Sequence, residues 1–314
     1  MRRSFRGPAH GLVLAVFVAA CSGGAATTAP STGARSPAAT TPGASTSATT
    51  PAATQIVPIA GGLLDKIMKA GKIVVSTDPK YPPQSKQKPD GSFEGFDIDV
   101  ANEIGKRLGV TVEYTTPDWT AITAGGWGGR WDMSVGSMTI TPDRAKALDF
   151  SPPYYFTPAQ MTVRTDTGIT SIDGLVGKTV CSGEGTTYDQ WLNGTLDFGP
   201  AGKPAPPPAG IKSTTLPTDT DCPDQWKAGR NDFEGWLSSI TTVDGAIDAD
   251  LPVTKVGDPV YLEPLGVAVD KSGPTTTDFV AWLTVTIAEM HADGTLSEFS
   301  EKWFKTDYTL PPTP

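Results

Sequence analysis

The sequence predicts an α/β fold built mostly of parallel sheets. Segments of alternating apolar residues, such as 72–78, are followed by amphipathic segments such as 95–109, in which apolar residues recur every three or four positions. Strands that alternate with helices in this way form parallel sheets with helices packed on their faces. About 260 residues follow a low-complexity N-terminal region, which is enough for two modest lobes.

The first half of this region contains four expected strands and one long helix. The strands are expected where β-branched and apolar residues concentrate, at 72–78, 110–116, 131–138 and 160–166. The helix over 95–109 has one apolar face and ends at Gly109, because glycine is favoured just after the last helical turn.

The second half keeps the same alternation with looser connections. A strand–loop–helix unit is expected over 178–192, and a Pro- and Gly-rich surface loop is expected over 198–210. The remaining expected elements are a strand at 211–218, a helix starting within 222–230, a strand at 232–239, a helix at 240–250, two strands within 253–271 and two helices within 275–304, separated by Asp293-Gly294.

Residues 1–20 have the features of a lipoprotein signal peptide. Three arginines precede the apolar run 11–20, which is too short to span a bilayer as a permanent helix. Small residues then precede Cys21, a pattern that resembles the lipobox in which the cysteine is lipidated and becomes the new N-terminus. An ordinary secretory signal with an incidental cysteine is the alternative. We expect an extracytoplasmic protein that its lipid anchors to the cell membrane.

Residues 21–55 are expected to form a disordered tether. Apart from Arg35, residues 22–54 contain only Ser, Gly, Ala, Thr and Pro, and such a segment cannot bury enough apolar surface to offset the entropy of ordering it. Removal of the signal peptide takes three arginines and no acids, so the net charge changes from −9 to −12. We do not expect so acidic a protein to bind nucleic acid.

The cysteines predict a disulfide. Cys181 and Cys222 remain once Cys21 carries a lipid, and two cysteines in an exported protein favour a disulfide. Cys181 ends an expected strand and Cys222 starts a helix after the next strand, so adjacent parallel strands would bring them close. A metal pair is the alternative, but His10 leaves with the signal peptide and His291 stands alone, so no metal or other cofactor is expected.

Arg144 occupies an unusual position. Thr141 and Pro142 suit the start of a helical turn, and Arg144 falls in that first turn, where the helix dipole favours an acid over a base. The arginine either forms a surface ion pair with Asp143 or Asp149, which would contribute little to stability, or it holds an anion.

A series of motifs resembles the extracellular solute-binding proteins of family 3, which are the polar amino-acid receptors of ABC importers. The motifs are TDPKYPP, GFDIDVANEIGKRLG, GSMTITPDRAKALDFSPPYY, GKTVCSGEGTTYDQWL, AGR, VGDPVYLEPLGVAV and ADGTLSEFSEKWF, in the family order, and they cover about residues 60–308. The resemblance implies a two-lobed periplasmic-binding-protein fold of type II with two hinge crossings. The implied parts are a discontinuous lobe 1 (56–163 and 265–314), lobe 2 (164–264) and crossings at 161–164 and 265–269.

The resemblance also implies a function. Receptors of this family capture a solute between two closing lobes and deliver it to the permease of an ABC importer. We therefore expect a free polar amino acid as ligand, ABC permease subunits as partners, a monomer, and no enzymatic activity.

The resemblance assigns the head group of the ligand to specific residues. Arg144 falls on the arginine that clamps the ligand carboxylate, and a guanidinium can make two parallel charge-assisted bonds to a carboxylate, which a lysine cannot. Ser137 and Thr139, two apart at a strand end, match positions that meet the ammonium and the carboxylate. In the second lobe, the residues expected to close on the carboxylate through free N–H groups before a helix are Gly185, Thr186 and Thr187.

Other aligned residues are expected around the ligand side chain. Tyr81 and Trp119 match positions that flank it. Asp78 and Glu184 are expected to set side-chain preference, and Asp78 stands where receptors for basic amino acids place an acid, although the TDPxY motif also occurs in receptors for other solutes. Asp97 and Asp99 are expected to cap or orient the helix that they begin rather than to contact ligand.

Two departures from the family pattern leave the ligand class open. Gln84 follows YPP where the family usually has an aromatic residue. Many members also carry an aspartate for the ammonium on the lobe-two strand after AGR, where this chain reads FEGWLSS. We place Ser238 at that position in preference to Asp250, because no helix fits between Asp250 and the next strand, and Glu234 is a candidate to compensate.

Two other functions remain as alternatives. A few proteins of this fold are periplasmic dehydratases that act on cyclic carboxylic acids, and here Glu184 or Glu234 would be the candidate general acid or base. The chain could also be a ligand-sensing subunit for a separate signalling partner. The sequence does not name the amino acid.

Overall fold

The computed structural model describes residues 56–311. The expected signal peptide (1–20), Cys21 and the expected tether up to residue 55 lie outside the described residues. Within 56–311, no helix is both long and apolar enough to cross a membrane.

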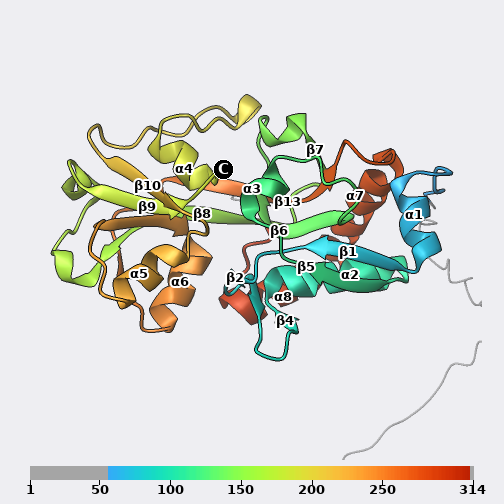
Figure 1. Cartoon of the computed structure of the whole chain (residues 1–314), viewed down its shortest axis with the longest axis horizontal. Helices are drawn as coiled ribbons and strands as arrows, with labels where there is room; N and C mark the ends of the chain where they lie inside the picture. The colour runs from blue at the N-terminus through green and yellow to red at the C-terminus, as the bar shows by residue number, and fades with distance from the viewer. Residues whose placement is uncertain (1–55, 312–314) are drawn as a thin grey trace, which may run out of the picture. The chain divides into compact units, whose positions relative to one another are not determined.

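A ten-stranded mixed sheet runs through the described residues (Figure 1). Its main path consists of β10 (Lys212–Leu216), β9 (Thr179–Gly183), β11 (Gly235–Ser239), β8 (Tyr155–Arg164), β13 (Tyr261–Asp270), β6 (Met133–Thr139), β1 (Lys72–Ser76) and β5 (Thr111–Thr115). Off this path, β12 (Val253–Lys255) pairs with β8, and β7 (Leu148–Phe150) pairs with β13. Three short strands, β2 (Lys80–Tyr81), β3 (Ser85–Gln87) and β4 (Phe93–Glu94), form a separate sheet.

The first lobe is built around β1, which pairs in parallel with β5 and β6. The helices whose buried side chains join this core are α1 (Leu63–Ala70), α2 (Phe96–Leu108), α7 (Thr277–Ala292) and α8 (Thr295–Phe304). The two C-terminal helices pack in the same apolar cluster as the N-terminal elements. We therefore propose that the first lobe is discontinuous in the sequence.

Helix α2 follows the sequence prediction closely. Ala101 and Ile104 from its expected apolar face lie in the core of the first lobe. Gly95 directly precedes the helix with φ 136°, and a Cβ at this position would lie 2.1 Å from the carbonyl oxygen of Gln84, so only glycine fits there. Gly109 follows the last turn in the left-handed conformation that was expected.

The second lobe contains β9 with its parallel neighbours β10 and β11. Its helices are α4 (Thr187–Leu192), α5 (Asp221–Lys227) and α6 (Ile240–Asp248). Successive strand residues point to opposite faces of the sheet, so Val180 joins one apolar cluster and Cys181 joins another. The lobe thus has a buried core on each face of its sheet.

Two long strands connect the lobes, as Figure 1 shows for β8 and β13. They pair with each other over residues 155–159 and 261–265, after which β8 runs beside β11 and β13 runs beside β6. Met161 packs in the second lobe and Leu265 packs in the first. We therefore propose that the chain passes between the lobes at 156–158 and 262–264.

This passage lies earlier in each strand than the crossings expected at 161–164 and 265–269. The sequence analysis recognised β8 only from residue 160, although the strand starts at Tyr155. Pro158 lies in the part that was missed and faces Leu262 in the ladder. A proline within a run of apolar residues weakens the pattern of a strand. The helix expected after Pro142 is only a 3₁₀ turn, Arg144–Lys146.

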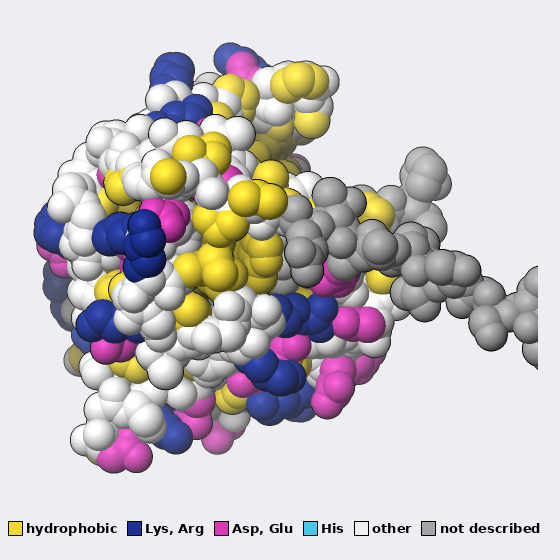
Figure 2. Space-filling view, turned by 90° about the vertical axis from the view of Figure 1, so that its right-hand side faces the viewer, with side chains coloured by type: hydrophobic (Ala, Val, Ile, Leu, Met, Phe, Trp, Pro, Cys, Tyr) yellow, Lys and Arg dark blue, Asp and Glu magenta, His cyan; other side chains and the backbone are white. Residues whose placement is uncertain are grey.

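The surface at the far end of the first lobe carries charges of both signs. Figure 2 shows Lys, Arg, Asp and Glu side chains scattered over this face, with hydrophobic side chains gathered between them. The exposed large apolar residues at the start of the described chain are Val57, Ile59 and Met68. None of these three residues lines the cavity between the lobes.

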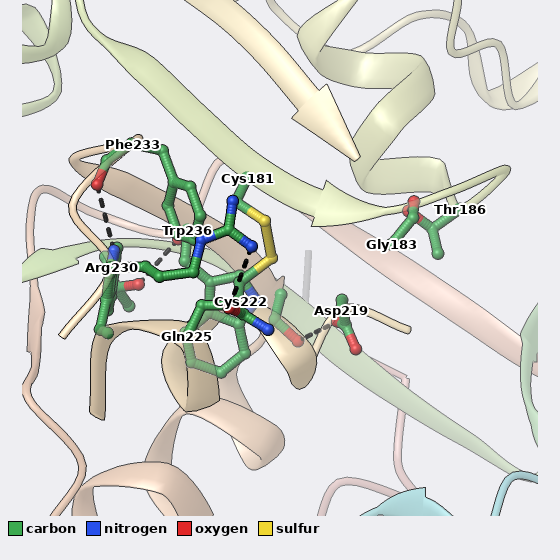
Figure 3. Close-up of a disulfide and its surroundings, with 12 residues drawn as sticks. Cys181, Gly183, Thr186, Asp219, Cys222, Gln225, Arg230, Phe233 and Trp236 are labelled. Atoms are coloured by element: carbon green, nitrogen blue, oxygen red, sulfur yellow. Dashed lines mark hydrogen bonds between the residues drawn. A yellow bond between two sulfur atoms is a disulfide. The ribbon is translucent and has the colours of Figure 1, made fainter. Parts of the chain in front are cut away.

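The predicted disulfide is present and links Cys181 to Cys222 with a Cα–Cα distance of 6.0 Å. Cys181 lies in β9 and Cys222 lies in the first turn of α5, both fully buried (Figure 3). Because β9 and β10 are parallel neighbours, the start of α5 after β10 comes back next to β9. The bond therefore fixes the β10–α5 connection to the centre of the second lobe.

Removal of this disulfide is expected to destabilise the protein. The two cysteines are 41 residues apart, and a loop of that length corresponds to roughly 3–4 kcal/mol of stabilisation by the chain-entropy estimate. The variant Cys181→Ser/Cys222→Ser should lower the free energy of unfolding by about that amount in urea titrations. A double variant as stable as the wild-type protein would contradict this prediction.

Candidate functional site

The largest group of predicted site residues surrounds a cavity between the two lobes, with an empty volume of about 470 Å³. It lies beyond the carboxyl ends of β1, β6, β9 and β10, the place where open α/β sheets bind ligands. Its lining consists of Asp78, Tyr81, Trp119, Gly136, Ser137, Thr139, Arg144, Thr186, Thr187, Tyr188, Pro217, Thr218, Asp219 and Glu263.

Arg144 is buried in this cavity and not on the surface. Its side chain is only 5% exposed, and the Thr141 hydroxyl accepts a hydrogen bond from its backbone N–H at 3.3 Å. Nη1 donates to the carbonyl of Thr139 at 2.9 Å, and Nη2 donates to the carbonyl of Gly185 at 3.2 Å. The guanidinium carbon lies 5.2 Å from the centre of the Trp119 ring.

The surface ion pair considered for Arg144 is not formed. Asp143 pairs with Lys146, and Asp149 pairs with Lys271. Burial lowers the pKa of Arg144 to about 10, so the guanidinium stays charged at neutral pH. A buried cation held by carbonyl groups alone is costly unless an anion joins it, and the cavity offers the space for one.

Glu263 is the carboxylate that faces this region from the hinge. It lies in β13, is 1% exposed, and accepts hydrogen bonds from Thr139 and Tyr188, each at 2.8 Å, and from the Thr187 hydroxyl. Burial raises the pKa of Glu263, although these hydroxyls and the charge of Arg144 act in the opposite direction. The sequence analysis missed this residue.

Two further carboxylates line the cavity. Asp78 follows β1 and accepts hydrogen bonds from the Lys80 N–H at 2.7 Å and the Thr218 hydroxyl at 3.1 Å. Asp219 follows β10, is 3% exposed, and accepts from the Ser238 hydroxyl. Burial, together with the nearby charges of Asp78 and Glu263, raises the pKa of Asp219 to about 7. The cavity therefore contains three carboxylates and one guanidinium.

Most of the predicted binding residues meet in the cavity. Those that line it are Asp78, Tyr81, Trp119, Ser137, Thr139, Arg144, Thr186 and Thr187. Gly185 lies at its edge, where its carbonyl accepts from Arg144 and from Nε1 of Trp119 at 3.4 Å. Glu184 lies in an adjoining hollow, together with Asp118 and Asp221.

The two residues proposed for the missing aspartate lie outside the cavity lining. Ser238 is fully buried and contacts Asp219, so it stands behind that carboxylate. Glu234 accepts from the backbone N–H of Thr179 at 3.1 Å and does not line the cavity. This geometry does not support a direct contact between Ser238 and a ligand. It also does not support the suggestion that Glu234 compensates the charge of the ligand's ammonium group.

Asp97 and Asp99 lie outside the lining, and each orients a neighbouring element. Asp97 accepts from the hydroxyls of Ser137 and Tyr154, both at 2.7 Å. Ser137 has φ 53°, an uncommon conformation for a residue other than glycine, so Asp97 holds a strained segment of the cavity wall in place. Asp99 accepts from Lys302 and from Trp303, which joins α8 to α2.

Polar contacts hold the lobes together on the side of the cavity formed by α6. The Tyr81 hydroxyl lies 3.1 Å from that of Ser239. Gln84, which stands in place of the family's aromatic residue, is fully buried and donates to Thr241 at 2.7 Å and to Thr242 at 3.1 Å. The structure therefore has its lobes closed, and Gln84 contributes to closure by hydrogen bonding.

A sequence model of the bacterial extracellular solute-binding proteins, family 3, matches residues 73–306. The chain belongs to this family. The match spans both lobes and both connecting strands, so the family membership applies to the whole described fold.

Known proteins support the same assignment. The chain is 32% identical to the L-cystine-binding protein TcyJ of Escherichia coli (strain K12), over 79% of this chain and 88% of that protein. It is 25% identical to the arginine-binding extracellular protein ArtP of Bacillus subtilis (strain 168), over 74% and 86%. Both relatives are named as binding proteins for an amino acid.

A solved structure confirms the fold class. The crystal structure of the ancestral amino acid-binding protein AncCDT-1, described as a precursor of cyclohexadienyl dehydratase, matches with a TM-score of 0.65 and 30% identity, covering 77% of this chain and 99% of that chain. The predicted two-lobed type II fold of the family is thus confirmed. The sequence analysis identified both the family and its main motifs.

The buried acids predict how stability depends on pH. Burial raises the pKa of Asp97 and of Asp219 to about 7 each, so the folded protein binds these protons more tightly than the unfolded chain does. This contribution is complete below the unfolded-state pKa near 4, and it is lost as the pH rises to about 7.

The free energy of unfolding should therefore fall between pH 5 and pH 7, by up to roughly 1.4 kcal/mol per pH unit for each group. Asp97→Asn should reduce this slope, because one of the buried acids that titrate in this range is removed. Urea titrations of the ligand-free protein at pH 5, 6 and 7 measure how the free energy of unfolding depends on pH. An unchanged slope in the variant would show that Asp97 does not titrate in this range.

Proposed function

We propose that the chain captures a free amino acid with a cationic side chain between its lobes and delivers it to the permease of an ABC importer. The observation that carries this proposal is the arrangement of charge in the cavity, where Arg144 is buried and, among the described residues, hydrogen-bonded through its guanidinium to carbonyl groups rather than to a carboxylate. A free amino acid brings the anion that such a guanidinium requires, because its carboxylate can accept two parallel bonds.

The carboxylate end of the ligand is proposed to lie between the lobes at Arg144. Thr186 and Thr187 line the cavity at the start of α4, and the Gly185 carbonyl already contacts the guanidinium from the second lobe. A ligand bound here touches both lobes at once. Such a ligand stabilises the closed form relative to an open one, which is the general basis of capture by hinge closure.

The preference for a cationic side chain rests on the excess of carboxylates. Asp78, Asp219 and Glu263 face the same cavity as the single guanidinium. A zwitterion with a neutral side chain leaves this excess uncompensated, whereas a second positive group offsets part of it. Tyr81 and Trp119 are proposed to flank the side chain, and an aromatic ring can also attract a cation.

The surroundings of the cavity agree with a cationic ligand. The adjoining hollow shares Asp78 and Trp119 with the cavity and adds Asp118, Glu184 and Asp221 to its walls. Carboxylates lining one opening attract cations and raise their local concentration. Glu184 is therefore proposed to act at the entrance rather than on the bound ligand.

The remaining expectations complete the proposal. We propose that Cys21 carries a lipid that anchors a monomeric receptor to the outer face of the cell membrane. The family relatives named above are binding proteins for transport, and we propose that this chain likewise performs no reaction on its ligand. Of the two acids nominated for a dehydratase, Glu234 does not line the cavity and Glu184 lies only in the adjoining hollow.

Calorimetry with L-arginine, L-lysine, L-glutamine, L-cystine and L-glutamate tests this proposal. The wild-type protein should bind L-arginine or L-lysine more tightly than the other three. Arg144→Ala should weaken that binding roughly 100-fold or more, since it removes one partner of a buried charge pair. Arg144→Lys should recover only part of the loss, because an ammonium cannot reproduce the two parallel bonds.

The matched control is Arg130→Ala, because Arg130 stacks on Trp131 in the first lobe and does not line the cavity. The affinity of the Arg130→Ala variant for L-arginine and L-lysine should equal that of the wild-type protein. Tight binding by Arg144→Ala would reject the proposed role of the guanidinium, and a preference for L-glutamate would reject the cationic ligand class.

A further inference from the structure

The ammonium group of an amino acid needs an acidic partner, and the position expected for it in the second lobe holds a serine. Ser238 carries only a hydroxyl, is fully buried, and does not line the cavity. A neutral hydroxyl compensates a buried ammonium less well than a carboxylate does. The question is therefore which group of the second lobe takes this role.

We propose that Asp219, on the connection between β10 and α5, is the second-lobe acid that holds the α-ammonium of the ligand. This inference rests on the proposed function, because it assumes that an amino acid occupies the cavity. It moves the acidic partner from β11 to a different segment of the chain.

The contact between Ser238 and Asp219 is the first observation in favour. The Ser238 hydroxyl donates to Oδ2 of Asp219, so the Asp219 carboxylate lies within one hydrogen bond of the side chain at the expected position. Asp219 lines the cavity, whereas Ser238 does not. The two residues together thus place a carboxylate in front of the serine.

The segment that carries Asp219 is held close to β9. The N–H of Cys222 donates to the carbonyl of Asp219 at 3.1 Å, and Cys222 is itself joined to Cys181 of β9 by the disulfide. A Cβ on Gly183 would lie 3.0 Å from the backbone nitrogen of Asp219, so this glycine permits a close approach of the segment to β9. Figure 3 labels Asp219 and Gly183 among the residues in the surroundings of this disulfide.

The other two cavity acids have different surroundings. Glu263 already accepts from three hydroxyl groups, those of Thr139, Thr187 and Tyr188. Asp78 is bound by Lys80 N–H and Thr218, and it also borders the adjoining hollow where the ligand side chain would leave the cavity. Asp219, like Asp78, has one described side-chain donor, in this case Ser238, but it does not border that hollow.

Burial of the Asp219 carboxylate is a cost to the protein without ligand. Its pKa is raised to about 7, mainly by burial and also by Asp78 and Glu263. A positive group beside it would lower that pKa again and stabilise the ionised form. An acid placed at a cost to stability within a cavity is typical of a binding site rather than of a structural contact.

Three ligands that differ in one group each separate the roles of the acids. L-Arginine has both head groups, 5-guanidinopentanoic acid lacks the ammonium, and agmatine lacks the carboxylate. Asp219→Asn should weaken the binding of L-arginine and of agmatine by at least about 30-fold. Its affinity for 5-guanidinopentanoic acid should stay within about threefold of the wild-type value. Arg144→Ala should give the opposite pattern, with agmatine the least affected.

Each result supports or overturns the inference. A loss of affinity for 5-guanidinopentanoic acid equal to that for L-arginine would place Asp219 at the ligand side chain. An unchanged affinity of Asp219→Asn for L-arginine, together with a loss in Glu263→Gln, would give the ammonium to Glu263. Either outcome overturns the inference while leaving the proposed function intact, whereas a wild-type protein that binds no amino acid rejects the proposed function itself.

Two controls show that the variant is folded and that its effect is local. Asp219→Asn should unfold at a temperature no lower than that of the ligand-free wild-type protein at pH 7.5, because it removes a buried charge while keeping an oxygen for Ser238. Asp224→Asn, an exposed acid on α5 outside the cavity, should bind L-arginine as the wild-type protein does.

Discussion

The cavity is organised around one buried cation with which no carboxylate of the described residues pairs directly. The guanidinium of Arg144 is removed from water, yet its described partners are two carbonyl groups and the ring of Trp119. Carbonyl dipoles soften the penalty of burial but do not cancel a full charge. Glu263 lies close enough to influence Arg144, but its oxygens accept from hydroxyl groups instead. A small anionic group that enters the cavity can therefore form an ion pair with the Arg144 guanidinium.

The fold brings the polar and charged groups of the cavity together from distant parts of the chain. Arg144 and Asp78 follow strands of the first lobe, Thr187 and Asp219 follow strands of the second, and Glu263 comes from the strand that connects them. Each group stands near the carboxyl end of a strand or in the hinge, so relative motion of the lobes changes its distance from the others. The groups that line the cavity therefore come together only when the two lobes are closed.

The sequence predicted the fold and much of the cavity, because those features have local signatures. Strand alternation, the apolar face of α2, the TPDR turn and the cysteine spacing are each visible within a short segment. Asp219 and Glu263 have no such signature. Asp219 is one of several acids in TDTDCPD, and only the pairing of β9 with β10 shows which of them faces the cavity. Glu263 was detectable only as a single acid within an apolar strand, YLEPLGVAV.

Gln84 contributes more than packing. Its amide reaches hydroxyl groups at the start of α6 in the opposite lobe, and Gly245 of that helix lies against Pro83, where a Cβ would be 3.1 Å from the ring. These contacts between the lobes do not involve a ligand. They therefore lower the free energy of the closed form even when the cavity is empty. Stabilising the closed form in advance raises the apparent affinity for the solute, but it also makes the empty protein resemble the loaded one in shape.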